Sequence, residues 1–310
     1  MSEMDDLARE IPVEFRVMQL LDRMAYTGDQ SDYSITTLID SPQVAKLKKK
    51  HTSALTEPIE ERLAALIGTA VHNMLTKACL GLKDVEVAKR FSATMLGSTV
   101  SGECDKITLL PSGGYKITDW KVVRAKSMKF DSGVKLAWVQ QLNCYAALAR
   151  LNGLKVEELE VITIIKDWAK SDLVTSATYP KLPILRHPVN VWSDKESCDY
   201  LVERVRTHQV EDLKDCTEEE RWARKPVHAV HEKLAGGSGY KKRATRLFPT
   251  SAEAEAFILE RGLKASIQFR EGRSIRCEGN YCGVSEFCEQ FKRLSQANEE
   301  SDDDGFDTLF

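Results

Sequence analysis

The sequence lacks any apolar run long enough to cross a membrane, and its start lacks the pattern of a secretion signal. No stretch of roughly eighteen residues is predominantly apolar. The first ten residues, MSEMDDLARE, are acidic where a signal peptide is basic and then apolar. We therefore expect a cytoplasmic protein without a membrane span. At 310 residues, 42% of them hydrophobic, the chain is long enough to bury a substantial core.

The sequence also lacks a strong excess of charge of either sign. Its 44 basic and 47 acidic residues give a net charge of -3. The last twelve residues, EESDDDGFDTLF, hold six of the acids and no base, so the rest of the chain carries 41 acids against 44 bases. This composition does not indicate a strongly basic protein, and it predicts that the acidic end, residues 296–310, does not fold.

Basic residues nevertheless gather in two stretches. The first holds Lys46, Lys48, Lys49 and Lys50; the second, with Glu232 as its single acid, holds Arg221, Arg224, Lys225, Lys233, Lys241, Lys242, Arg243 and Arg246. Such clusters suit a phosphate backbone, and a solvated helix face is the alternative for any one of them.

Helical periodicity is clearest over residues 56–80. Thr56 is a candidate cap, and Leu63, Leu66, Ile67, Val71 and Met74 recur at helical spacing, which predicts that this stripe faces the core. His72 then lies on the opposite, small-residue side of the helix. A structural histidine is the ordinary interpretation of such a residue.

Three strand-like runs follow at 85–95, 99–110 and 115–123. The loop Pro111-Ser112-Gly113-Gly114 predicts a hairpin between the last two. If Leu110 faced Tyr115, Asp105 would lie opposite Trp120, so a bulge or a different loop closure is needed to bring Asp105 beside Asp119.

Further along, we expect a helix over 133–152, a central strand over 158–168, an extended segment over 184–192 and a helix over 193–214. A basic, loop-rich region follows, and Thr250 is expected to cap a short helix that ends near Gly262. No internal repeat is evident.

The stretch YKITDWKVV, residues 115–123, places an acid and an amine on one face of a strand. Side chains two apart in a strand share a face, so Asp119 and Lys121 point the same way and Trp120 points the other way. A plain salt bridge is the simplest interpretation of the pair. On the next predicted helix, Gln141 and Tyr145 lie four apart and share a face.

Taken in order, these pieces resemble the PD-(D/E)XK nuclease superfamily, and within it the RecB-like exonuclease branch that includes CRISPR-associated and phage exonucleases. The matching residues are GTAVH at 68–72, GECD at 102–105, DWK at 119–121 and QLNCY at 141–145. The resemblance implies an α/β fold with a restriction-endonuclease-like core, a central mixed β-sheet flanked by helices, with helical insertions.

The resemblance also implies roles for the matching residues. It assigns catalysis to Asp105, Asp119, Lys121, Gln141 and Tyr145, and the binding of Mg²⁺ or Mn²⁺ to His72, Asp105 and Asp119, as one metal or two. Oxygen ligands suit these hard cations, and a lysine can orient or deprotonate the attacking water. The substrate implied is DNA, with Arg124, Lys126, Lys241, Lys242 and Arg243 as candidate DNA-binding residues.

The eight cysteines are expected to be thiols or metal ligands rather than disulfides. Five are scattered and are taken as core residues: Cys79, Cys104, Cys144, Cys198 and Cys216. Cys277, Cys282 and Cys288 cluster in RCEGNYCGVSEFC. Several nucleases of this branch hold an iron-sulfur cluster on one early and three late cysteines, but Ser41 stands at the early position here. An iron-sulfur cluster, a zinc site and a packed hairpin remain the alternatives.

The chain ends in Phe306-Asp307-Thr308-Leu309-Phe310, which is similar to the peptides by which replication proteins dock on sliding clamps. Phe306, Leu309 and Phe310 are the candidate partner-binding residues, for a clamp or another replication protein. A solubilising tail is the alternative.

We expect four regions: an N-terminal extension packing on the core (1–55), the nuclease core (56–215), a basic, cysteine-containing region completing the core (216–295) and the tail (296–310). The expected activity is a metal-dependent DNA exonuclease acting at ends or single strands in recombination, repair or replication. The alternatives are a structure-specific endonuclease or resolvase and a nuclease-dead DNA-binding adaptor.

Overall fold

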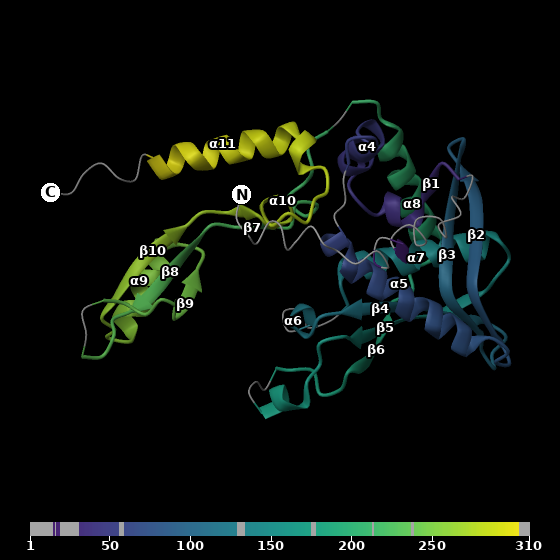
Figure 1. Cartoon of the computed structure of the whole chain (residues 1–310), viewed down its shortest axis with the longest axis horizontal. Helices are drawn as coiled ribbons and strands as arrows, with labels where there is room; N and C mark the ends of the chain where they lie inside the picture. The colour runs from purple at the N-terminus through teal and green to yellow at the C-terminus, as the bar shows by residue number, and fades with distance from the viewer. Residues whose placement is uncertain are drawn as a thin grey trace. The chain divides into compact units, whose positions relative to one another are not determined.

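The computed structural model describes residues 15, 17–18, 31–55, 59–128, 134–174, 178–212, 214–236 and 239–303. These residues fall into two compact units (Figure 1). Unit 1 comprises Met1–Pro42 and Thr56–Asp212, and unit 2 comprises Gln43–Leu55 and Leu213–Phe310. The segment Gln43–Leu55, which is the end of the expected N-terminal extension, is grouped with unit 2.

Unit 1 is built on a six-stranded mixed sheet in the order β1-β3-β4-β5-β6, with β2 paired to β3. Strand β1 runs parallel to β3, and β4 runs parallel to β5. The other neighbouring strands are antiparallel. The strands are β1 (Tyr33–Ser34), β2 (Val85–Met95), β3 (Ser98–Leu109), β4 (Tyr115–Val123), β5 (Val156–Ile165) and β6 (Ile184–Val189).

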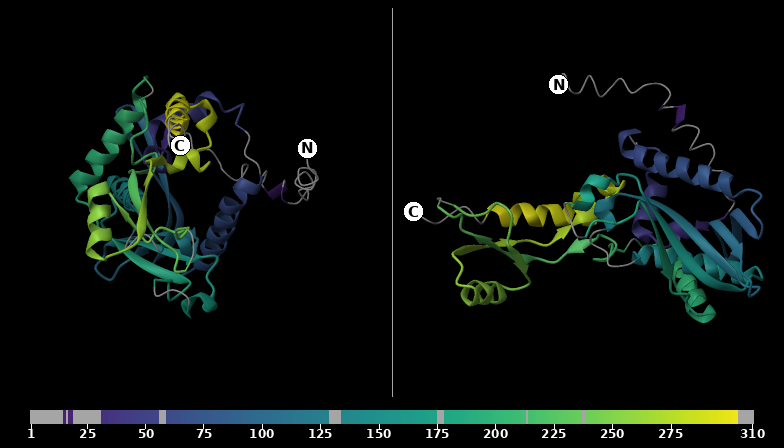
Figure 2. Two further views of the ribbon diagram at one scale, coloured as in Figure 1. Left: turned by 90° about the vertical axis from the view of Figure 1, so that its left-hand side faces the viewer. Right: turned by 90° about the horizontal axis from the view of Figure 1, so that it is seen from below.

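The helices of unit 1 connect and cover this sheet (Figures 1 and 2). They are α3 (Ile35–Leu38), α5 (Ile59–Cys79), α6 (Ala125–Met128), α7 (Leu136–Leu151) and α8 (Asp194–Gln209), with a 3-10 turn η1 (Lys170–Val174). Helix α7 links the parallel strands β4 and β5, as such a crossover requires. The expected fold class is confirmed: a mixed sheet flanked by helices, consistent with a restriction-endonuclease-like core.

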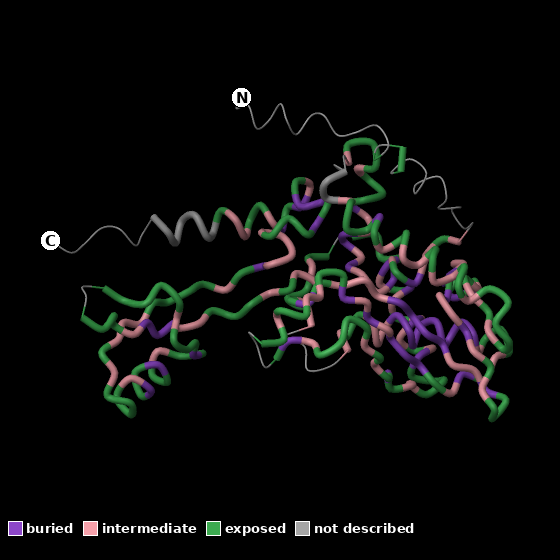
Figure 3. The backbone as a smooth tube through the Cα atoms, turned by 60° about the horizontal axis from the view of Figure 1, so that its bottom comes forward, coloured by how far each residue is buried: buried purple, intermediate pink, exposed green. Residues whose placement is uncertain are grey.

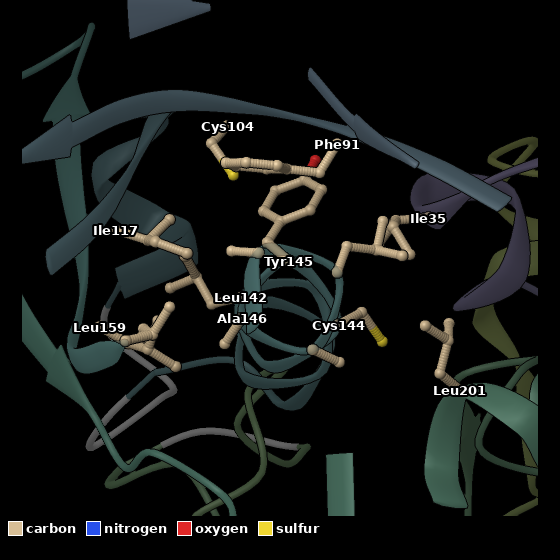
Figure 4. Close-up of a cluster of buried hydrophobic side chains, with 14 of the residues drawn as sticks. Ile35, Phe91, Cys104, Ile117, Leu142, Cys144, Tyr145, Ala146, Leu159 and Leu201 are labelled. Atoms are coloured by element: carbon tan, nitrogen blue, oxygen red, sulfur yellow. The ribbon is translucent and has the colours of Figure 1, made fainter. Parts of the chain in front are cut away.

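The core of unit 1 lies between α7 and the sheet. Ala146, Ala147, Leu148 and Ala149 are fully buried, so one stretch of α7 is covered on all sides. In Figure 4 the side chains of Leu142 and Ala146 point toward Ile117 and Leu159 of the sheet, and Tyr145 points toward Phe91 and Cys104. Figure 3 shows buried positions concentrated in this region.

The orientation predicted for the helix over 56–80 is wrong. Of the apolar stripe expected to face the core, only Leu66 is buried; Leu63, Ile67 and Met74 are exposed on α5. The side that carries His72 faces the sheet instead, since the imidazole contacts β3 and β4 side chains.

Unit 2 contains a three-stranded antiparallel sheet, β9-β8-β10, covered on one face by α9 (Figure 2). The Thr250 hydroxyl accepts a hydrogen bond from the Glu253 N–H, which confirms the predicted cap of α9. The elements of unit 2 are α4 (Pro42–Lys50), β7 (Ala223–Arg224), β8 (Val227–Glu232), β9 (Arg246–Phe248), α9 (Ser251–Glu260), β10 (Ala265–Arg270), β11 (Arg273–Ser274), α10 (Ile275–Glu278), η2 (Ser285–Phe287) and α11 (Glu289–Asp303).

A second apolar cluster joins α4 to the C-terminal cysteine segment. Val44 and Leu47 of α4 pack against Cys282, Val284 and Cys288. Unit 2 is therefore assembled from two segments that are far apart in the sequence.

Within the described part of the chain, no helix combines the length and apolar composition that a membrane span needs.

Candidate active site

Strand β4 holds the two residues on which the site is built. Asp119 is only 3% exposed, and its carboxylate Oδ2 lies 2.8 Å from the ammonium Nζ of Lys121. The two groups form a close ion pair, and Oδ2 itself is shielded from solvent. Because the carboxylate is almost fully buried, its negative charge favours a cation or a proton at this position.

Burial raises the pKa of Asp119 to about 6. The positive charge of Lys121 opposes this shift, and the negative charge of Asp105 reinforces it. Because desolvation penalises the charged form, the carboxylate ionises fully only near neutral pH. A carboxyl group that changes its charge close to pH 6 is suited to a functional site as well as to a structural ion pair.

Asp105 reaches the site through an irregularity in β3. Leu109, not Leu110, pairs with Tyr115, and the β3–β4 pairing runs as far as Lys106 and Thr118, the chain neighbours of Asp105 and Asp119. The alternation of buried residues along β3 breaks between Cys104 and Ile107. The different loop closure that the sequence required is therefore present.

The Asp105 carboxylate ends the β3–β4 ladder. Its Oδ2 accepts a 2.7 Å hydrogen bond from the backbone N–H of Trp120, and its Oδ1 lies 3.3 Å from His72 Nδ1. The His72 ring also meets the Trp120 ring edge-on, at 5.9 Å between centroids. These contacts fix the imidazole of α5 over the end of the hairpin.

The pKa of His72 is raised. Burial alone would lower it, but the hydrogen bond and the charge of Asp105, together with the charge of Asp119, outweigh that effect. The imidazolium is thus stabilised by the Asp105 and Asp119 carboxylates, and His72 would bind a metal ion only after losing this proton.

Helix α7 adds a hydrogen-bonded chain that ends on Lys121. Lys121 Nζ donates to Gln141 Oε1 at 2.8 Å, and Gln141 Nε2 donates to the Tyr145 hydroxyl at 2.7 Å. Gln141 and Tyr145 are both buried, and burial keeps the pKa of Tyr145 well above its usual value, so the phenol stays protonated. The chain holds the ammonium of Lys121 at the Asp119 carboxylate.

Gly102 has a role that its sequence motif did not reveal. A β-carbon at this position would lie 2.7 Å from the Tyr145 ring and 2.8 Å from the Ile35 side chain. The ring can occupy its place only because residue 102 lacks a side chain. The available signal was the position of Gly102 three residues before Asp105 in GECD.

The donor set fits a hard divalent cation. Asp105 and Asp119 supply carboxylate oxygens, and His72 supplies an imidazole nitrogen. Across the described residues, however, no three histidine, cysteine, aspartate or glutamate side chains are already gathered as a metal site. Oxygens of a phosphate and water would have to complete the coordination.

The basic residues expected to bind DNA are exposed. Arg124 and Lys126 lie at the end of β4 and in α6, close in the chain to Lys121. Lys241, Lys242 and Arg243 lie in unit 2, where the Lys241 ammonium is 2.6 Å from the Glu232 carboxylate. Their role in binding DNA stays a prediction.

Cys216, expected as a core residue, packs against the apolar cluster of unit 2 that contains the buried Cys282 and Cys288. Burial and the nearby Cys282 and Cys288 raise the pKa of Cys277. The side-chain oxygen of Gln43 accepts from the Cys216 N–H at 2.8 Å, and its amide donates to Cys288 Sγ at 3.4 Å.

All eight cysteines are free thiols. Among the described side chains no group of three is placed to hold a metal, and the iron-sulfur cluster, the zinc site and the packed hairpin all stay predictions. Phe306, Leu309 and Phe310, the candidate partner-binding residues, lie outside the described residues.

No protein-family model and no curated protein matches the chain. Among solved structures, it is similar to SSO0001, with a TM-score of 0.45 and 14% identity over 71% of this chain and 91% of that one. It is also similar to a phage-related exonuclease from Haemophilus somnus 129PT, with a TM-score of 0.28 and 15% identity over 67% of this chain and 85% of that one. At such scores these likenesses carry no functional argument. The argument for a function depends on the geometry of the site.

Proposed function

We propose that this protein is a metal-dependent nuclease that hydrolyses DNA phosphodiester bonds, acting on ends or single strands as an exonuclease. The observation that carries the proposal is the buried Asp119 carboxylate, held between Lys121 and the Asp105–His72 pair. The resemblance to the RecB-like nucleases supports the same assignment, because its motif residues meet at this place.

Phosphodiester hydrolysis needs positive charge, because the phosphate repels an attacking anion. A divalent cation on Asp105, Asp119 and His72 would supply that charge and make water a nucleophile near neutral pH. The acids and the lysine also argue against a nuclease-dead adaptor, which has no need of a buried, pKa-shifted carboxylate.

The protein's own residues then orient the reaction. The Lys121 ammonium, fixed by Gln141, would hold the attacking water and stabilise the negative charge that develops on the phosphate. Tyr145 keeps the Gln141 amide in the orientation that presents its oxygen to Lys121. Asp105 positions His72 and, through the Trp120 N–H, the strand that carries Asp119.

End-labelled linear DNA and covalently closed circular DNA, each incubated with Mg²⁺ or Mn²⁺, test the proposal. We expect linear DNA to be shortened from its ends and circular DNA to remain intact. Cutting of the circle would favour the structure-specific endonuclease, and DNA binding without any cleavage would favour the adaptor.

Variants of strand β4 sharpen the test. We expect Asp119→Asn or Lys121→Ala to abolish cleavage and to leave DNA binding measurable. The matched control is Lys116→Ala, which removes a lysine of the same strand that lies 3.8 Å from Glu158. Normal cleavage by either site variant, or an equal loss in the control, would contradict the assignment.

A further inference from the structure

Two aromatic side chains lie exposed next to each other in unit 2. Trp222 is 50% exposed and Tyr281 is 65% exposed, and their ring centroids are 5.6 Å apart at an interplanar angle of 47°. Neither residue belongs to a described core cluster of this unit. The pair is therefore apolar surface that the fold presents to solvent.

The backbone holds Trp222 in a conformation that a bulky residue rarely adopts. Its φ is +52°, in the left-handed region, where glycine or asparagine is usual. The turn around it is hydrogen-bonded, from Trp222 N to the Glu219 carbonyl at 3.0 Å and from Ala223 N to the Glu218 carbonyl at 2.8 Å. Such local strain in an ordered turn is a reason to look for a function of the ring.

Tyr281 is positioned by the turn that precedes it. A β-carbon on Gly279 would lie 2.6 Å from the Tyr281 ring, so the ring rests against the glycine backbone. The Tyr281 N–H donates to the Arg276 carbonyl at 3.0 Å. The turn therefore keeps this ring against the protein surface, next to Trp222.

The positively charged side chain of Arg276 lies beside the aromatic pair. Its guanidinium lies 5.6 Å from the centre of the Trp222 ring, and its Nη1 donates to the Glu220 carbonyl at 3.2 Å. A cation over an indole face is favourable, and the hydrogen bond keeps the guanidinium in place.

A basic pocket of about 200 Å³ lies next to Trp222 in the sequence. Arg221 and Ala223, the residues on either side of Trp222, both line it. One of its two acids, Glu278, is bound by Arg273 at 2.5 Å, and Arg224 and Lys225 are exposed. The charged residues that line it are Arg221, Arg224, Lys225, Arg273, Glu218 and Glu278.

We propose that Trp222 and Tyr281 form a stacking platform for the bases of single-stranded DNA, with the adjoining basic pocket taking a backbone phosphate. Aromatic rings beside a positively charged groove are the general means of binding a single strand, because every base offers a π-face. Duplex DNA keeps those faces stacked inside the helix and cannot use the platform. The inference depends on the proposed function, which makes DNA the substrate.

The test is the binding of a fluorescently labelled single-stranded oligodeoxynucleotide, and of the same sequence as a duplex, to the full-length chain in EDTA. Anisotropy should show that Trp222→Ala and Tyr281→Ala each weaken single-strand binding about 5- to 100-fold. Duplex binding should change less than about threefold. The matched control is Phe269→Ala, which removes another exposed aromatic of unit 2 and should leave both affinities unchanged.

A conservative variant keeps the test valid if Trp222→Ala does not fold. Tryptophan emission of the wild-type protein should be quenched by the single strand, and Trp222→Phe should lose that quenching while retaining most of the affinity. Unchanged single-strand binding in a folded Trp222→Ala protein, an equal loss for the duplex, or persistent quenching in Trp222→Phe overturns the platform.

Failure of this inference can be told apart from failure of the proposed function. If the wild-type protein degrades DNA with Mg²⁺ or Mn²⁺ but the platform variants bind a single strand as well as wild type, only the platform is overturned. If the wild-type protein neither cleaves DNA nor binds either form, the nuclease assignment fails and the platform with it.

Discussion

The absence of one side chain at Gly102 decides where the Tyr145 ring lies, and Tyr145 in turn orients Gln141 and Lys121. At the scale of single residues, the site is thus a series of contacts in which each group fixes the next. An error of about 1 Å at one end of such a series is enough to lower catalysis at the other.

Gly102→Ala tests this series. The new methyl group would overlap the Tyr145 and Ile35 side chains, so we expect the protein to lose about 1–3 kcal/mol of stability and most of its nuclease activity. Thermal unfolding and a cleavage assay measure the two effects. Gly68→Ala is the control: nothing lies within 4 Å of its β-carbon position on α5, and it should stabilise the helix by about 0.5–1 kcal/mol. Full activity in Gly102→Ala would contradict the role of the glycine.

We expect the ionised Asp119 side chain to destabilise the metal-free protein. Its pKa is about 6 in the folded protein, above the ordinary value of 3.8, so the folded state binds the proton more tightly and an ionised Asp119 destabilises it. In EDTA at pH 8 we expect Asp119→Asn to be more stable than wild type, by on the order of 2 kcal/mol. This gain should shrink as the pH falls from about 6 to about 4, where the wild-type carboxyl is protonated. Urea unfolding across this range measures it; an Asn variant that is less stable at pH 8 would contradict the shift.

The sequence was sufficient to select His72, Asp105, Asp119, Lys121, Gln141 and Tyr145, because their order and spacing on predicted elements are local properties of the chain. It was not sufficient to show that Lys121 reaches Gln141 or that Gly102 admits the Tyr145 ring. Those contacts depend on how α7 packs on the sheet, and nothing in the spacing of the residues encodes a packing distance.

At the scale of elements, the error over α5 has a physical origin. Periodicity shows that a helix has an apolar stripe, but not which surface that stripe covers. Here Leu63, Ile67 and Met74 are exposed, and the side with Leu66 and His72 lies toward the sheet. Strand boundaries were predicted closely, because the β-branched runs and the glycine turn at 111–114 are local signals.

Two buried glutamines connect elements of unit 2. Gln43 of α4 and Gln290 of α11 both accept from the backbone N–H of Cys216 at 2.8 Å, and Gln290 also donates to the Cys216 carbonyl at 2.9 Å. The segment before β7 is therefore held by side chains from two helices. This interaction was not predictable from the sequence, since isolated glutamines carry no positional signal.

Because the two glutamines share one donor, their effects should not be additive. We expect Gln43→Ala and Gln290→Ala each to cost about 1 kcal/mol in urea unfolding, and the cost of the double variant to differ from their sum, since both variants remove an acceptor of the same N–H. Gln268→Ala, an exposed glutamine of β10, is the control and should change stability by less than about 0.5 kcal/mol. Strict additivity would contradict the shared contact.

At the scale of the whole molecule, the chain contains two units, each with its own buried cluster. Such a protein need not unfold in one step. We expect calorimetry to resolve two transitions. Leu201→Ala, in the core of unit 1, should lower one of them, and Phe257→Ala, in the cluster under α9, should lower the other, each by about 2–5 kcal/mol of unfolding free energy. A single transition that both variants shift equally would contradict this independence.

Unit 2 combines Gln43–Leu55 with Leu213–Phe310. During synthesis it therefore cannot fold until the second segment has been made. Gln43 and Cys288 are separated by 245 positions in the chain. At roughly 5–20 residues per second, a ribosome needs about 12 to 50 seconds to add them. Helix α4 therefore leaves the ribosome long before its partners exist, while unit 1 can already complete its sheet. The apolar face of α4, Val44 and Leu47, is thus a segment of the nascent chain that a chaperone could bind during that interval.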